Sequence, residues 1–164
     1  MRVSGIVSES IVDGPGIRFV IFTQGCPHSC VECHNHQTWD SNGGKEITVK
    51  ELKRQLRNKK NIRGVTFSGG EPFLQAEELA ELAEFIKLQG WDIFTYTGFT
   101  YEELIKSKDE NIQKLLYLSD FLVDGPFIIN LKDIRLKFRG SSNQRIIDLN
   151  ESRAKGKIIV WGNE

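Results

Sequence analysis

The chain has 164 residues, of which 39% are hydrophobic and 27% charged, so it can bury one ordinary core and is not mainly disordered. We expect a single domain over residues 1–164. Its 22 Lys and Arg residues balance its 22 Asp and Glu residues, which leaves no broad basic face for nucleic acid or an anionic membrane. No stretch has the apolar length of a secretory signal or a membrane span, and the expected location is the cytoplasm.

Strand-like and helix-like stretches alternate along the chain. Residues 17–23 are β-branched and aromatic and run into a turn at Gly25, which predicts a strand followed by a loop. A helix is expected next, because Thr48 and Glu51 have the spacing of a capping box ahead of an apolar stripe. The following strand is predicted at residues 65–67.

The second half continues the alternation. Residues 76–88 place their apolar side chains on one helical stripe, and a strand over 91–96 follows at once. Helical patterns then extend over residues 100–116, and residues 121–125 form another predicted strand.

This order predicts parallel strands joined by right-handed helical crossovers. A complete eight-unit barrel takes roughly 250 residues, so this chain has room for about five or six units. The expected fold is of the α/β class, an open parallel (β/α) partial barrel with its site at the carboxyl ends of the strands. Residues 144–148 and 157–161 can add one or two further strands.

The three cysteines of the chain lie within eight residues, at Cys26, Cys30 and Cys33, on the loop that leaves the first predicted strand. An odd number of thiols cannot all be paired in disulfides, and their proximity indicates a metal centre. One possibility is a structural zinc ion with Cys3His ligation, since three histidines lie on or near this loop. The other is a four-iron cluster that three thiolates hold, with one iron left open for a substrate.

Several motifs carry a resemblance to a known family. The Cys26–Cys33 segment fits the CxxxCxxC signature of the radical S-adenosylmethionine superfamily, and residues 68–72 (SGGEP) resemble its GGE motif. Residues 12–18 resemble the opening segment of glycyl-radical activating enzymes. In the second half, three segments are similar to the activating proteins of anaerobic ribonucleoside-triphosphate reductases: residues 96–99, 123–127 and 139–145. The resemblance runs from about residue 5 to about residue 150.

The resemblance implies a cofactor site. The three cysteines would hold a 4Fe-4S cluster, whose open iron would chelate the methionine part of S-adenosylmethionine. The residues implied to contact that cofactor are Glu32, His34, Ser68, Gly69, Gly70, Glu71, Thr97 and Asp124. The family often has an aromatic residue where this chain has Glu32, so only backbone contacts are carried over for Glu32 and His34. Glu71 would accept a hydrogen bond from the methionine ammonium group.

Each of these residues also has a plainer interpretation. Gly69 and Gly70 suit an ordinary turn between a strand and a helix. Glu71 could complement a helix dipole, Asp124 could cap a turn, and Thr97 could pack at a strand end. The 139–145 segment is either a polar surface loop or a docking segment for a partner.

The resemblance implies an enzyme that cleaves S-adenosylmethionine to a 5′-deoxyadenosyl radical and installs a glycyl radical on anaerobic ribonucleoside-triphosphate reductase. That reductase is then the protein substrate, and the electron comes from an external donor such as a flavodoxin-type protein. One alternative is the activation of another glycyl-radical enzyme such as pyruvate formate-lyase. From a different class, the chain could be a zinc-stabilised binding module without catalysis.

Overall fold

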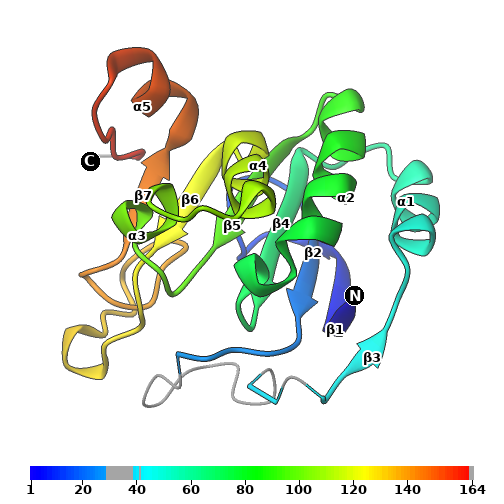
Figure 1. Cartoon of the computed structure of the whole chain (residues 1–164), viewed down its shortest axis with the longest axis horizontal. Helices are drawn as coiled ribbons and strands as arrows, with labels where there is room; N and C mark the ends of the chain where they lie inside the picture. Colours follow the sequence, from blue (N-terminus) through cyan, green and yellow to red (C-terminus); the bar gives the residue numbers. More distant parts are fainter. Residues whose placement is uncertain (29–38, 41, 163–164) are drawn as a thin grey trace.

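The computed structural model describes residues 1–28, 39–40 and 42–162 (Figure 1). Within these residues, strands form one sheet in the order β3-β1-β2-β4-β5-β6-β7. The strands are β1 (Arg2–Ser10), β2 (Arg18–Thr23), β3 (Lys45–Glu46), β4 (Gly64–Gly69), β5 (Asp92–Tyr96), β6 (Phe121–Asp124) and β7 (Arg145–Asp148). The α-helices are α1 (Val49–Arg57), α2 (Ala76–Leu88), α3 (Tyr101–Ile105), α4 (Glu110–Leu118) and α5 (Leu149–Lys155), with short 3₁₀ turns η2 (Pro72–Gln75) and η3 (Ile129–Leu131).

The middle of the sheet is parallel, as the alternation of strands and helices predicts. Strand β2 pairs with β4, β4 with β5, and β5 with β6, all in parallel register. Helix α1 connects β2 to β4 and helix α2 connects β4 to β5, while α3 and α4 connect β5 to β6. The predicted open α/β arrangement is therefore confirmed.

Both edges of the sheet are antiparallel, which the alternation did not predict. Strand β1 runs antiparallel to β2, and β7 runs antiparallel to β6. A parallel connection needs a crossover of roughly a dozen residues or more, usually a helix, whereas only residues 11–17 lie between β1 and β2. The parallel part therefore has four strands, and antiparallel strands extend it where further β/α units were expected.

The pleat of the strands gives the sheet two different faces. One face carries Phe19, Ile21, Val65, Phe67 and Ile93, which belong to the main core under helices α1, α2 and α4. Figure 1 shows α2 and α4 side by side over the middle of the sheet. Because side chains alternate along a strand, the neighbouring residues Phe22, Thr66, Ser68, Phe94 and Tyr96 lie on the opposite face. That face carries the functional groups.

Arg18 anchors the connection between β1 and β2 to the sheet. Its side chain is fully buried, and its guanidinium lies 2.5 Å from Asp92. It also donates to the Thr66 hydroxyl at 2.7 Å and to the Pro15 carbonyl at 2.9 Å. Burial lowers the pKa of Arg18, and the Asp92 carboxylate opposes that shift. The buried arginine thus fixes residues 11–17 at the amino ends of the parallel strands, and the Thr66 hydroxyl, which donates to the Asp13 carbonyl at 2.7 Å, holds them against the face of the sheet.

Among the described helices, none has the length and apolar character needed to cross a membrane.

Candidate active site

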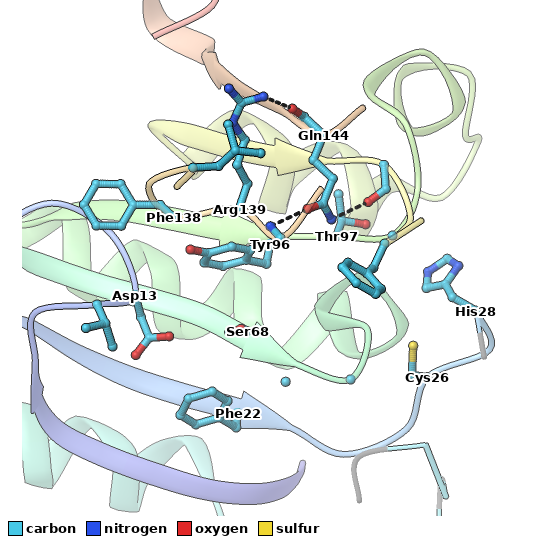
Figure 2. Close-up of a pocket in the computed structure, with 18 residues that line it drawn as sticks. Asp13, Phe22, Cys26, His28, Ser68, Tyr96, Thr97, Phe138, Arg139 and Gln144 are labelled. Carbon is cyan, nitrogen blue, oxygen red and sulfur yellow. Dashed lines mark hydrogen bonds between the residues drawn. The ribbon is translucent and has the colours of Figure 1, made fainter. Parts of the chain in front are cut away.

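A cavity of about 540 Å³ opens where the parallel strands end (Figure 2). Its wall includes Cys26 after β2, the Ser68–Gly70 turn at the end of β4, Thr97 after β5 and Gly125 after β6. Parallel strands all point their carboxyl ends at one edge of a sheet, so residues far apart in the sequence meet there. The volume is in the range of small-molecule and cofactor pockets.

The lining suits a cofactor with an aromatic base and a polar end. Figure 2 shows Tyr96 and Phe22 on opposite sides of the space, with Cys26 at one end and Asp13 near the other. Aromatic rings provide surfaces for a planar group, and the backbone of the glycine turn provides close polar contacts. The residues present therefore fit a nucleoside cofactor placed beside a group held by Cys26.

The structure brings together five of the residues predicted to form the site. Cys26, Ser68, Gly69, Gly70 and Thr97 all line the cavity. Four others, Cys30, Cys33, Glu32 and His34, lie outside the described residues. Glu71 and Asp124 lie behind the wall, where each is held by other groups of the chain.

The Glu71 carboxylate is fully buried and accepts several hydrogen bonds. One oxygen accepts from the Gly98 N–H at 2.8 Å and lies 2.6 Å from His28 Nε2. The Phe73 N–H donates to the other oxygen at 3.1 Å, and the Thr97 hydroxyl lies 2.9 Å from both. Glu71 also caps the 3₁₀ turn that follows it, so the plainer interpretation of a carboxylate at a helix start is present.

Asp124 takes part in an ion-pair network. Its side chain is 1% exposed and accepts from the Tyr101 N–H at 2.8 Å. Arg145 lies 2.5 Å from Asp124 and 2.7 Å from Glu102, and these hydrogen bonds raise the pKa of Arg145 above its ordinary value. The hydrogen bond to Arg145 likewise lowers the pKa of Glu102. Asp124 thus stabilises the junction of β6, β7 and α3.

Three residues at the cavity escaped the sequence interpretation. Asp13 lines it and accepts a hydrogen bond from Ser10 at 2.6 Å. Tyr96 lines it too, and burial raises the pKa of Tyr96 above its ordinary value. Phe138 has a φ of 64°, rare for a residue with a side chain, and its ring lies 6.0 Å from that of Phe94. Asp13 and Tyr96 lie in the 12–18 and 96–99 segments that carry the resemblance, which was the available signal, whereas Phe138 lies outside all of the segments named above.

Gly69 shows why the turn needs glycine. Its φ is +95°, and a Cβ atom there would lie 2.5 Å from the backbone nitrogen of Thr23. We expect Gly69→Ala to lower the free energy of unfolding by at least about 2 kcal/mol, from left-handed strain plus the backbone contact. Gly90→Ala is the matched control, because Gly90 also has a positive φ but has open space around it. Denaturant unfolding should show a cost of only about 1 kcal/mol for Gly90→Ala, and equal costs would contradict the close approach.

Comparison with known proteins identifies the family. Residues 12–147 match the family described as 4Fe-4S single cluster domain. The anaerobic ribonucleoside-triphosphate reductase-activating protein of Enterobacteria phage T4 is 37% identical over 89% of this chain and 93% of its own length. The protein of the same name from Escherichia coli is 36% identical over 82% of this chain and 90% of its own length.

A second group of relatives is longer. The pyruvate formate-lyase 1-activating enzyme of Escherichia coli is 34% identical over 98% of this chain, and the chain spans 65% of that enzyme's length. The cluster domain covers the Cys26 loop, the glycine turn and Thr97, so the residues that line the cavity lie inside the matched region. The chain therefore belongs to the 4Fe-4S single cluster domain family and, with these relatives, to the activating enzymes of the radical S-adenosylmethionine superfamily.

Proposed function

We propose that the chain installs a glycyl radical on anaerobic ribonucleoside-triphosphate reductase. The observation that carries this proposal is the meeting of Cys26, the Ser68–Gly70 turn and Thr97 on one cavity at the carboxyl ends of the strands. A thiolate at one end of a pocket with aromatic walls is the arrangement that a cluster and a nucleoside cofactor need side by side.

The residues have separate tasks in this proposal. Cys26, Cys30 and Cys33 hold three irons of the cluster. The Ser68–Gly70 turn offers backbone groups to the methionine part of the cofactor, and Glu32 and His34 add backbone contacts. When bound, the cluster and S-adenosylmethionine supply a 5′-deoxyadenosyl radical.

Two further predicted residues act from behind the wall. Thr97 lines the cavity while its hydroxyl is held by Glu71, so its contact to the cofactor is steric or through its backbone. Glu71 and Asp124 hold the ends of β4, β5 and β6 in place around the cofactor. The cavity wall contributed by residues 136–140 shields the radical from water.

The relatives support the reductase as the target. The match covers 93% and 90% of the two reductase-activating proteins but 65% of the pyruvate formate-lyase 1-activating enzyme. Activation of pyruvate formate-lyase is the second candidate, favoured by a match that takes in 98% of this chain. An external donor of the flavodoxin type provides the electron, and the reducing cytoplasm keeps the thiolates available.

The test is anaerobic reconstitution followed by electron paramagnetic resonance with S-adenosylmethionine and dithionite. We expect slow release of 5′-deoxyadenosine by the protein alone, because the partner completes the water-excluding site. Added reductase should accelerate release and produce a glycyl-radical signal, and pyruvate formate-lyase in its place should not. A radical on pyruvate formate-lyase only would move the target to the second candidate, and no radical on either protein would refute the activity.

A further inference from the structure

His28 lies two residues after Cys26, and its imidazole is seated against the loops that follow β4 and β5. The side chain is 15% exposed, and Nε2 lies 2.6 Å from the Glu71 carboxylate. A carboxylate only accepts hydrogen bonds, so Nε2 is the donor of this pair. Figure 2 shows the imidazole beside Cys26 at the same end of the cavity.

The space that the His28 imidazole occupies has the shape of a flat ring. A Cβ atom on Gly98 would overlap the imidazole, so the missing side chain at that position makes the space. The ring of Phe99 closes the other side, edge to face with the imidazole at 4.7 Å between centroids and 78° between planes. Gly98 and Phe99 both come from the loop after β5. The imidazole is thus held by packing as well as by its hydrogen bond.

The acceptor of this hydrogen bond is itself fixed by the chain. Glu71 receives the Thr97 hydroxyl and the backbone N–H groups of Phe73 and Gly98. Its own N–H donates to the Gly25 carbonyl at 2.7 Å, which ties it to the residue before Cys26. A carboxylate has about four acceptor positions, and His28 provides the fourth donor. An ammonium contact to Glu71, as the resemblance implies, would require one of these donors to leave.

We propose that His28 is a positioning residue that sets the cysteine segment against the cofactor pocket through Glu71. The inference rests on the proposed cluster and cofactor and adds a structural task that neither the cysteine motif nor the glycine turn performs. At its base the segment is closed by a hydrogen bond from the Cys26 N–H to the Trp39 carbonyl at 3.2 Å. His28 adds a second fixed point on the pocket side, two residues after Cys26, which would hold a cluster ligand beside the cavity.

Side chains that orient metal ligands without touching the metal commonly contribute 10–100-fold to metal affinity or activity. The consequence for this chain is that loss of the His28 donor should loosen both the cluster and the cofactor while the barrel stays folded. The buried side chains of the main core lie under the helices. Phe99 packs against that core as well as against His28, so we expect the core to keep its packing when His28 is replaced.

Three substitutions separate the hydrogen bond from the packing. His28→Ala removes both, and His28→Phe keeps a ring against Phe99 but has no donor. His28→Gln is the matched rescue, because its amide nitrogen is the same number of bonds from Cα as Nε2. The measurements are the rate of iron loss to a chelator, the S-adenosylmethionine dissociation constant of the reconstituted protein, and hydrogen exchange at the Gly98 amide of the metal-free protein.

For His28→Ala and His28→Phe we expect iron loss about tenfold faster and cofactor binding about tenfold weaker, with an unchanged melting temperature. Gly98 exchange should rise about tenfold in both, and His28→Gln should stay within about threefold of the unsubstituted protein in all three measurements. The positioning role would be overturned if His28→Ala or His28→Phe gave the same values as the unsubstituted protein. It would also be overturned if His28→Gln showed the same losses as His28→Ala. A protein that assembles no cluster at all would instead refute the proposed function, while Gly98 exchange would still decide whether His28 holds this loop.

Discussion

Cys26→Ala, Cys30→Ala and Cys33→Ala are each expected to abolish the 4Fe-4S cluster while leaving the chain folded. In the proposed cluster each of the three thiolates holds one iron, so loss of one ligand would leave a second iron without protein ligation. The fold survives because the core that builds it, from Val3 to Leu149, lies under the helices and not on the cysteine loop. This is the largest functional effect that any single substitution in the chain should have.

The content of iron and acid-labile sulfide per chain measures the loss of the cluster, and far-ultraviolet circular dichroism measures whether the chain stays folded. Ser8→Ala serves as the control, since Ser8 is exposed on β1, away from the cavity. A cysteine variant that keeps a full cluster and turnover would show that its thiol is not a ligand.

Metal analysis of the same preparations tests the zinc alternative. In the Cys3His interpretation one of His28, His34 and His36 is a ligand, and the protein is colourless with one zinc ion. The match to a 4Fe-4S cluster domain favours a brown protein with iron and sulfide. Replacing each histidine with alanine should therefore leave the cluster stoichiometry intact, although His28→Ala should speed iron loss. Zinc that disappears with one histidine would reverse the assignment.

Arg145→Glu is expected to lower the free energy of unfolding by about 3 kcal/mol, because it removes the cation that balances buried Asp124. The loss should be at the lower end of the range for broken buried pairs, since the Arg145 side chain is itself 32% exposed. The substitution also places a third carboxyl group beside Asp124 and Glu102. For a chain of this size the melting temperature should fall by roughly 6–12 °C.

Arg135→Glu is the matched control for Arg145→Glu. Arg135 pairs with Asp133 at 2.9 Å, but its side chain is 87% exposed, so reversing its charge should change stability by less than about 1 kcal/mol. Thermal unfolding of the two variants under one buffer measures the difference. Equal, small losses would mean that Asp124 does not depend on Arg145.

This result also bears on the predicted docking segment. Because Arg145 is bound to Asp124 and Glu102, its substitution reports on folding before it reports on a partner. Arg139 is the better probe of docking: it lines the cavity, and its guanidinium donates only to a backbone carbonyl, that of Gln144, among the contacts of the described residues.

Elements that depend on neighbours in the sequence were predictable. Helix α2 begins and ends at the residues expected from its apolar stripe, and Thr100 and Glu103 form the capping box that their spacing indicates. Helix propensity, caps and turns act over a few residues, so a single sequence contains the information. The cysteine spacing and the glycine turn are local in the same sense, and they were enough to identify the family and its cofactors.

Contacts between distant segments could not be obtained in that way. Nothing near Arg18 indicates that it is buried against Asp92, and nothing near Glu71 indicates that Thr97, Gly98 and His28 converge on it. A polar group can be buried at low cost only when the fold places a hydrogen-bond partner beside it. Whether another strand provides that partner depends on the order and register of the sheet. The direction of β1 could not be predicted from local sequence either. The short connection between β1 and β2 excludes a parallel arrangement only if the two strands are already known to pair. The chain's motifs thus indicate the chemistry that we propose for it, and the meeting of the strand ends decides which side chains line the cavity and which hold the walls around it.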